Sequence, residues 1–230
     1  MYPKYGKRLL DIIASSTALI LLSPLMIYLA WKIKKNLGSP VLFSQIRPGK
    51  KNKLFRLYKF RSMTDARDKQ GNLLPDEMRM TDFGRKLRAT SLDELPELFN
   101  ILKGDMSLVG PRPQLVRDMV FFTEKEMHRQ DVTPGLTGLA QISGRNNIDW
   151  KERFAYDLQY IQNISLQEDL RIIWRTVFKV SQQEDIATDG METSEDYGDW
   201  LLRNGVITKE EYECKQNDAQ KLLMEFQKGV

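Results

Sequence analysis

Cysteine and histidine are nearly absent from this chain of 230 residues, which contains only Cys214 and His128. A single cysteine excludes an internal disulfide framework and a thiolate-rich metal site, and it fits a reducing, cytoplasmic setting. With one imidazole and no cysteine cluster, zinc chemistry is not predicted. Lys125 and Arg129 beside His128 indicate an exposed helix surface. We therefore interpret His128 as a structural residue.

Acidic residues are almost missing from residues 1–62, where thirteen Lys and Arg accompany a single acid, Asp11. Residues 181–230 reverse this balance with twelve acids and five bases, so the net charge of +4 hides a strong asymmetry. A basic region beside a membrane element attracts anionic headgroups and phosphorylated substrates, and we expect the acidic end to lie in solvent. Nucleic acid is the competing partner, but no reader motif accompanies the basic residues, and nucleic-acid binding is not predicted.

One long apolar run is present, at residues 12–31. A helix of that length reaches roughly 30 Å, the thickness of a hydrocarbon core. Basic residues lie on both sides of the run, which favours both ends on the cytoplasmic side of a membrane; they are Lys4, Lys7, Arg8, Lys32, Lys34 and Lys35. Ser23 and Pro24 interrupt the run. Proline cannot donate to the carbonyl of Ile20, and the Ser23 hydroxyl can bond to that carbonyl instead. The pattern predicts a re-entrant helix-break-helix, with a spanning anchor and a signal peptide as the alternatives.

The remainder of the chain predicts a mainly α fold with a small β-hairpin, an α+β arrangement. Residues 41–46 and 54–60 are rich in strand formers, and residues 47–50 between them are typical of a turn. Residues 65–80 are interpreted as a loop. Helices are predicted for residues 82–88, with Asp82 as N-cap, and for residues 93–102, closed by Gly104, and further helices for 150–163, 167–181, 195–203 and 209–226. The segments around residues 109–113 and 134–138 are predicted to be loops, because glycine and proline interrupt them.

The helix predicted at residues 167–181 has an apolar face with basic residues beside it. The apolar face consists of Leu166, Leu170, Ile173, Trp174, Val177 and Phe178, and Arg171, Arg175 and Lys179 follow one another at intervals of four. Such a helix could lie in a membrane interface, with its aromatic residues at the acyl boundary. An ordinary core-facing helix has the same pattern, and both interpretations stay open here.

Two adjacent acids, Asp93 and Glu94, form the sharpest chemical motif. Adjacent carboxylates point in different directions on a helix, so the two can have different roles at one site. At a helix start, unpaired N–H groups and the positive end of the dipole would hold Asp93 ionised and would also bind phosphate oxygens. The alternative is a capping box, with Ser91 as N-cap and Glu94 three residues later, although Pro96 weakens that pattern.

Basic residues on predicted loops and strand ends form the second motif. Arginine offers a planar fork to phosphate oxygens, and neighbouring prolines fix where that fork points. Together with the acidic pair, these residues predict a diphosphate site, and Glu94 with substrate oxygens would suit Mg²⁺. The residues are Lys59, Arg61, Arg88, Arg112 and Arg145.

Four segments and the Ser-Pro break resemble the bacterial sugar transferase family, whose small members are monotopic polyprenyl-phosphate phosphoglycosyl transferases. The resemblance covers residues 1 to about 185 and is carried by KRLLDIIASS, FSQIRPGKKNKLFRLYKFRSM, SLDELPELFNILKGDMSLVGPRP and VTPGLTGLAQISGRN. In length and spacing the chain is most similar to the undecaprenyl-phosphate diacetylbacillosamine-1-phosphate transferase type. The expected organisation is a re-entrant membrane helix at 1–36, a catalytic domain at 37–185 and an acidic extension at 186–230, which does not follow the family pattern.

The resemblance implies a two-step displacement. Asp93 would attack the sugar-bearing phosphate of a UDP-sugar and release UMP, and polyprenyl phosphate would then take the phosphosugar from Asp93. Glu94 would hold Mg²⁺. The same resemblance places further residues in the substrate site, namely Lys59, Arg88, Arg112, Arg145 and Asp157. Asp157 fits only if the helix at 150–163 faces the cavity, and otherwise it is a surface acid.

The implied location is the cytoplasmic face of the bacterial inner membrane. N-acetylated amino sugars are the family's frequent donors, while the actual UDP-sugar, the polyprenyl length and a homodimer stay open. Two other functions remain: a non-catalytic membrane-surface protein that binds anionic lipids, and a glycosyltransferase that moves sugar without phosphate and releases UDP.

Overall fold

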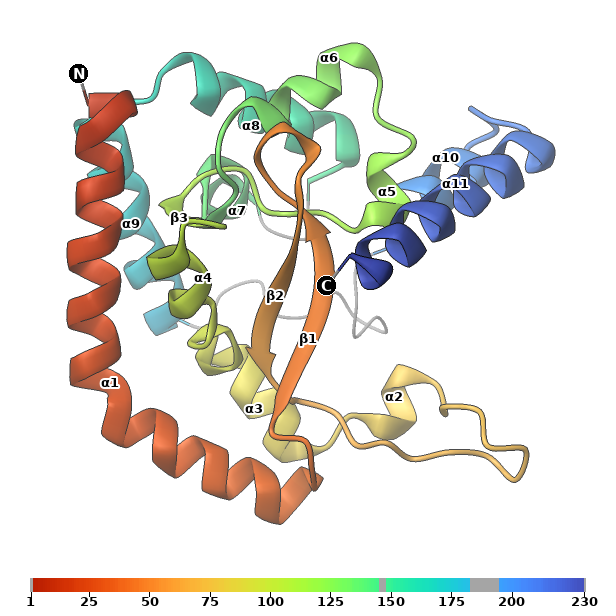
Figure 1. The fold of residues 1–230 in the computed structure, drawn as a ribbon, viewed down its shortest axis with the longest axis horizontal. Helices are drawn as coiled ribbons and strands as arrows, with labels where there is room; N and C mark the ends of the chain where they lie inside the picture. The colour runs from red at the N-terminus through yellow and green to blue at the C-terminus, as the bar shows by residue number, and fades with distance from the viewer. Residues whose placement is uncertain (1, 145–147, 183–194, 230) are drawn as a thin grey trace.

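The apolar run forms one long, bent helix. The protein's computed structural model describes residues 2–144, 148–182 and 195–229. After a short π-helical turn, η1 (Tyr2–Gly6), helix α1 (Lys7–Leu37) runs as two arms joined by a bend (Figure 1). Pro24 lies inside α1, and Ser23 Oγ donates to the Ile20 carbonyl at 2.8 Å, as predicted. We attribute the bend to this proline. Within the described residues, this helical stretch is the one that could cross a membrane by length and composition.

One side of α1 packs on the rest of the protein, and the other is exposed. Asp11 is buried, and its Oδ1 accepts from Ser107 Oγ at 3.0 Å and from the Leu108 amide at 2.9 Å. In the second arm, Ile33 is fully buried in a cluster with Phe60. The exposed apolar residues of α1 are Leu9, Ile12, Ile13, Ile20, Leu21, Leu25, Ile27, Tyr28 and Trp31.

The predicted hairpin is confirmed, with a longer first strand. Strand β1 (Leu42–Pro48) pairs antiparallel with β2 (Leu54–Phe60), so that Leu42 lies opposite Phe60 and Pro48 opposite Leu54. The predicted turn at 47–50 is wrong by two residues, because Arg47 and Pro48 still belong to the strand. The connection contains η2 (Lys50–Asn52), where Lys51 and Asn52 adopt positive φ values of 55° and 60°.

The segment before the acidic pair contains two short helices, α2 (Asp76–Arg79) and α3 (Asp82–Ala89). The first lies within the predicted loop. The second is capped by Thr81, whose side chain accepts from the Gly84 amide, so the prediction of Asp82 as N-cap is wrong by one residue. The single helix predicted at 93–102 is also wrong: it is divided into a 3₁₀ turn, η3 (Leu92–Glu94), and α4 (Glu97–Lys103), because Pro96 lacks an amide hydrogen. Gly104 closes α4 at φ 99°, as predicted.

A second, two-stranded sheet was not predicted. Strand β3 (Ser107–Val109) pairs in parallel with β4 (Gly135–Thr137). Each strand has three residues and lies in a segment rich in glycine and proline, which the sequence patterns assign to loops. Gly135 is required for this pairing, because a Cβ there would lie 2.1 Å from the Gly110 amide nitrogen.

Helices form the rest of the fold. The short ones are α5 (Val116–Met119), α6 (Glu124–Met127), η4 (His128–Asp131) and α7 (Leu139–Ser143). The predicted helices at 150–163 and 167–181 are confirmed as α8 (Trp150–Gln162) and α9 (Leu166–Gln182). A mainly α architecture with a small hairpin is therefore confirmed at this level. His128 is exposed and bound to Asp131, whereas the interpretation of Arg129 as a surface residue is wrong, since its side chain is 2% exposed.

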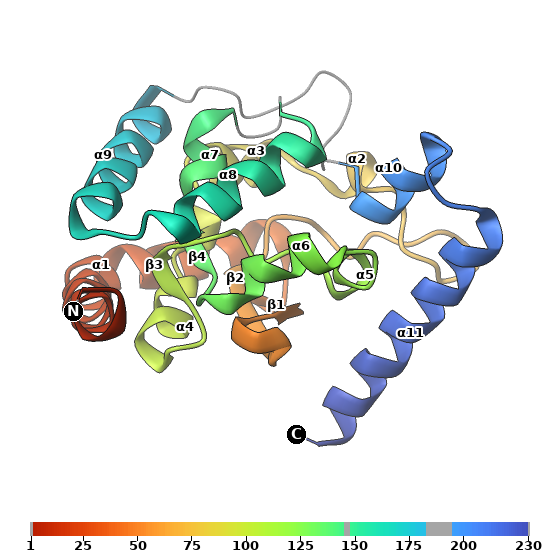
Figure 2. The ribbon, with the colours of Figure 1, turned by 90° about the horizontal axis from the view of Figure 1, so that it is seen from above.

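Helix α9 presents its apolar face outward. Trp174 is 75% exposed and Leu170 51%, while Asp169 and Ile172 on the opposite face are fully buried. Asp169 Oδ2 accepts from Tyr2 Oη and binds Lys7 Nζ, both at 2.6 Å, which joins α9 to the start of α1. The alternative of an ordinary core-facing helix is therefore excluded. Helices α1 and α9 lie at the same end of the molecule (Figures 1 and 2).

The last two helices are α10 (Tyr197–Arg203) and α11 (Lys209–Lys228). The expectation that the acidic end lies in solvent is wrong for α10, whereas Ala219 is the one buried residue of α11. Tyr197, Leu201 and Ala219 are buried in a cluster with α5 and α8. Figure 2 shows α11 running away from the body toward the C-terminus.

Candidate active site

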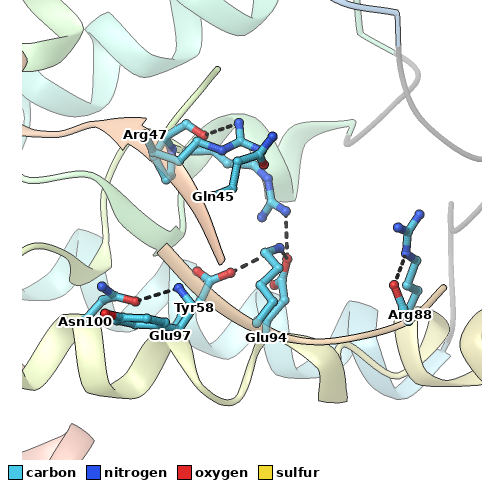
Figure 3. A network of polar contacts seen from close by, with 11 residues as sticks. Gln45, Arg47, Tyr58, Arg88, Glu94, Glu97 and Asn100 are labelled. Atoms are coloured by element: carbon cyan, nitrogen blue, oxygen red, sulfur yellow. Dashed lines mark hydrogen bonds and ion pairs between the residues drawn. The ribbon is translucent and has the colours of Figure 1, made fainter. Parts of the chain in front are cut away.

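Glu94 is held by two cations from different elements. Lys59, on β2, and Arg112, in the loop after β3, each place a nitrogen 2.7 Å from Glu94 Oε1. Burial alone would raise the pKa of Glu94, but Arg112 and Lys59 outweigh it and hold the pKa far below its usual range. Glu94 is therefore ionised and fixed in one orientation (Figure 3).

Asp93 is in a different state. Its side chain makes no hydrogen bond or ion pair with any described residue, although Asp93 is only 7% exposed. Burial and, after it, the charge of Glu94 raise the pKa of Asp93 to about 6, against the opposing effect of Lys59, Arg88 and Arg112. The expectation that the start of a helix holds Asp93 ionised is wrong in its cause, because Asp93 lies in a single 3₁₀ turn rather than at the start of α4. At neutral pH the Asp93 carboxyl is therefore ionised in most molecules, and it has no hydrogen-bond or ion-pair partner among the described residues.

The capping-box alternative is wrong. Ser91 adopts a left-handed conformation with φ 54° and makes no capping hydrogen bond through its side chain. The Glu94 carboxylate binds Lys59 and Arg112 instead of the Ser91 amide. The acids are therefore not explained by helix capping.

Three successive carbonyls fix the loop that carries Arg112. The Pro111 carbonyl accepts from the Gly135 amide at 2.9 Å, the Arg112 carbonyl from Arg129 Nη2 at 2.7 Å, and the Pro113 carbonyl from Arg47 Nη1 at 3.2 Å. The two prolines also restrict φ on both sides of Arg112. The loop is thus held in place from the β-hairpin, β4 and η4, and the Arg112 side chain points to Glu94.

Asp157 lies behind this loop. It is 2% exposed, and its Oδ2 accepts from Arg129 Nε at 3.0 Å and Nη2 at 2.7 Å. The alternative of a surface acid is therefore excluded. Asp157 orients Arg129, which in turn binds the Arg112 carbonyl, so it supports the site through a neighbour.

The other basic residues named by the sequence are placed differently. Arg88, on α3, donates from Nε to Ser62 Oγ at 2.9 Å and lies to one side of the Glu94 cluster (Figure 3). Its charge nevertheless lowers the pKa of Asp93. Arg61 binds Asp65 at 2.9 Å, and among the described residues it forms no hydrogen bond or ion pair with Asp93 or Glu94. Arg145 lies outside the described residues.

Glu97 is a site residue that the sequence reasoning missed. It is 2% exposed, its Oε1 lies 3.1 Å from Lys59 Nζ, and burial raises its pKa to about 7. Lys59 therefore lies between two carboxylates, and their charges raise its pKa against the effect of burial. The spacing of Glu94 and Glu97, one helical turn apart, was the available signal.

The acidic pair suits a metal ion only together with substrate oxygens. Within the described residues, no group of three His, Cys, Asp or Glu side chains could hold a metal ion. Lys59 and Arg112 both bind Oε1 of Glu94, and Oε2 has no hydrogen-bond partner among the described residues. Mg²⁺ commonly takes one or two carboxylates and completes its shell with phosphate oxygens and water, which fits this donor set.

The arrangement combines an unengaged carboxylate with fixed cations. An anionic phosphate that approached Asp93 would meet Lys59, Arg88 and Arg112, whose charges would offset the repulsion between the two anions. The chemistry that this geometry can support is nucleophilic attack by a carboxylate on phosphorus.

Comparisons with known proteins identify a family and several relatives of this chain. A family model described as "Bacterial sugar transferase" matches residues 2–183. The chain is 49% identical over 189 residues to the "Uncharacterized sugar transferase EpsL" of Bacillus subtilis, covering 82% of this chain and 94% of that protein.

Several relatives have names that state an activity. The "Undecaprenyl-phosphate galactose phosphotransferase" of Salmonella typhimurium is 39% identical over 198 residues, which is 79% of this chain and 41% of the relative. The "UDP-glucose:undecaprenyl-phosphate glucose-1-phosphate transferase" of Klebsiella pneumoniae is 46% identical over 186 residues, which is 75% of this chain and 39% of the relative. The chain thus spans about two fifths of the length of these two relatives.

Proposed function

Because the chain belongs to the bacterial sugar transferase family, we propose that it transfers a sugar 1-phosphate from a UDP-sugar to polyprenyl phosphate and releases UMP. The names of the Salmonella and Klebsiella relatives support the lipid acceptor. The observation that carries the proposal is the contrast within the acidic pair: Glu94 is bound by two cations, and Asp93 beside it is unengaged among the described residues.

In the first step, Asp93 acts as the nucleophile. A carboxylate oxygen of Asp93 forms a bond to the sugar-bearing phosphorus, the bond from that phosphorus to the bridging oxygen breaks, and UMP leaves with the electron pair. The raised pKa makes Asp93 more basic than an ordinary carboxylate while leaving it mostly ionised at neutral pH. In the second step, an oxygen of polyprenyl phosphate attacks the same phosphorus and frees the Asp93 carboxylate.

The cations bind the diphosphate and hold it in line with Asp93. Arg112 is fixed by its loop and offers a planar fork to phosphate oxygens, and Lys59 supplies a point charge. Glu94 would hold Mg²⁺ together with substrate oxygens. Bound there, the metal would offset the negative charge that develops on the leaving phosphate. Arg88, Arg61 and Arg145 stay predictions as substrate-binding residues.

We further propose that α1 enters and leaves the cytoplasmic leaflet as a re-entrant helix, with α9 lying in the interface. The exposed apolar residues of both helices support this arrangement, and Phe99 of α4 adjoins Ile20 and Ile27 of α1 in one apolar groove. A lipid phosphate lies at the headgroup plane, so an active site must be held close to that plane. The bend at Pro24 and the link from Lys7 to Asp169 would set its height.

The donor sugar is proposed to be an N-acetylated amino sugar, and the diacetylbacillosamine type stays a prediction. A homodimer likewise stays open. The two competing functions, anionic-lipid binding without catalysis and sugar transfer with release of UDP, are distinguished by the reaction products.

The test is to incubate the purified protein with a panel of UDP-sugars, Mg²⁺ and polyprenyl phosphate, and to measure UMP and UDP. We expect UMP from at least one donor, loss of UMP release in Asp93→Asn, and unchanged vesicle binding in that variant. Asp82→Asn, at an exposed acid of α3, is the matched control and keeps its activity. Release of UDP, or full activity in Asp93→Asn, contradicts the proposal.

A further inference from the structure

The last two helices lie beyond the residues that the family model matches, since that match ends at residue 183. Tyr197, the first residue of α10, is nevertheless only 5% exposed. Its ring centroid lies 5.1 Å from that of Trp150 and 5.0 Å from that of Phe154. Helix α10 therefore adds the Tyr197 ring to an aromatic cluster whose other two rings, Trp150 and Phe154, lie within the matched part of the chain.

Polar contacts fasten α10 to α5. The Tyr197 amide donates to Oδ1 of buried Asp118 at 2.8 Å. Arg117, the preceding residue, binds Asp196 at 3.2 Å and Asp199 at 3.3 Å. These are specific contacts with buried or half-buried groups, and they fix how α10 lies on the aromatic cluster.

The same cluster carries Arg129. The guanidinium of Arg129 lies 5.8 Å from the ring centroid of Phe154, the ring on which Tyr197 packs edge-on. Arg129 donates to the Arg112 carbonyl, and Arg112 binds Glu94. A continuous series of contacts therefore leads from Tyr197 to the acidic pair. Because packed interiors transmit strain, removal of the Tyr197 ring would loosen Phe154 and Arg129, and so weaken one of the three contacts that hold the Arg112 loop.

We propose that α10 is a positioning element of the active site. Tyr197 holds the aromatic cluster, the cluster holds Arg129, and Arg129 fixes the main chain of Arg112. The extension is thus required for the geometry of the site, although it lies outside the part of the chain that resembles the family. The kinetic consequence rests on the proposed function, whereas the consequence for loop mobility does not.

Two full-length variants test the proposal. Tyr197→Leu removes the ring and keeps the amide that binds Asp118. Gly198→Ala acts by steric clash, because a Cβ there would lie 2.5 Å from a ring carbon of Phe121. Gly229→Ala is the matched control, since its Cβ would meet only ordinary contacts at 3.7 Å and beyond.

The first measurement is amide hydrogen exchange, which needs no substrate. In both variants we expect exchange to rise at residues 195–203, which reports loosening of α10, and to rise at least about fivefold at residues 110–115. The control leaves both segments unchanged. Faster exchange at 195–203 with unchanged exchange at 110–115 overturns the proposal. This result is independent of whether any UDP-sugar is turned over.

The second measurement is a double-mutant cycle on UMP release. Tyr197→Leu alone should slow release about tenfold, since small displacements of a positioned group cost that much or more. In an Arg112→Lys background the same change should cost less than about twofold, because the positioned fork is already gone. A merely structural role for α10 predicts the full tenfold loss in both backgrounds, and that outcome overturns the proposal.

Discussion

Replacement of Asp157 by asparagine tests whether this residue supports the Arg112 loop or contacts the substrate. The variant removes a carboxylate from a pair whose two side chains are each 2% exposed. Oδ2 of Asp157 accepts two hydrogen bonds from Arg129, at 3.0 and 2.7 Å. Asparagine leaves the charge of Arg129 buried without its counterion.

The expected cost follows from that geometry. Breaking a buried ion pair by removing one partner costs about 3–5 kcal/mol, out of a total stability of about 5–15 kcal/mol for a domain. With an m-value of about 2–3 kcal/mol/M in urea, the unfolding midpoint of Asp157→Asn should fall by about 1–2.5 M. UMP release should fall as well, since Arg129 no longer holds the Arg112 carbonyl in one orientation.

The control is the double variant Arg129→Met, Asp157→Leu. Replacing a whole buried pair by apolar residues is often nearly neutral for stability, so we expect most of the midpoint to return. Activity should not return, because methionine cannot donate to the Arg112 carbonyl. An Asp157→Asn protein that loses activity at unchanged stability would refute this reasoning and indicate a direct role with substrate.

Two further predictions concern other parts of the molecule. Asp118→Asn keeps an acceptor for the Tyr197 amide and removes a carboxyl whose pKa burial raises from 3.8 to about 6. Because the folded state binds the Asp118 proton more tightly than the unfolded state does, this carboxyl stabilises the fold fully below its unfolded pKa. The contribution, up to about 3 kcal/mol of unfolding free energy, is lost as the pH rises through about 6. Urea unfolding should therefore find the variant more stable than wild type at neutral pH, with a gap that closes toward pH 4, and a gap that does not depend on pH contradicts this. Trp174→Ser, at a side chain 75% exposed on α9, should weaken binding to anionic vesicles at an unchanged unfolding midpoint. Ile172→Ser, at a fully buried position on the same helix, should instead lower the free energy of unfolding by at least about 2 kcal/mol. If both variants bound vesicles as well as wild type does, that result would contradict an interfacial α9.

Local signals predicted the elements whose determinants are close in sequence. The hairpin, the ends of α8 and the closure of α4 by Gly104 each depend on side-chain pattern or backbone preference within a few residues. The hydrogen bond from Ser23 to Ile20 belongs to the same class, since it follows from the missing donor of Pro24. The acidic pair was also found in this way, because two adjacent carboxylates near a proline are visible without any tertiary information.

The supports of the site could not be predicted, because they join distant segments. Arg129 and Asp157 are 28 residues apart, and only the fold makes them a pair. For the same reason, Arg129 looked like a surface residue beside His128. The parallel strands β3 and β4 are three residues long and form through close approach of glycines, which sequence patterns assign to loops.

The docking of α10 was missed for a related reason. Tyr197 lies among acids, so its surroundings indicate a solvated tail. Its burial depends on a hydrophobic cluster to which α5 and α8 contribute, and on the pairing of Arg117 with Asp196 and Asp199. Acidic residues that would repel one another in an isolated tail are here partners of a cation from another helix.

The most direct test of the account is to trap the covalent intermediate. The protein is mixed with its UDP-sugar and Mg²⁺ without polyprenyl phosphate, quenched in acid, digested with trypsin and analysed by mass spectrometry. We predict the mass of one sugar phosphate on the peptide of residues 89–103, localised to Asp93, and its loss on addition of polyprenyl phosphate. A phosphosugar on another residue, or UMP release at the wild-type rate with every residue unmodified, would contradict the central claim.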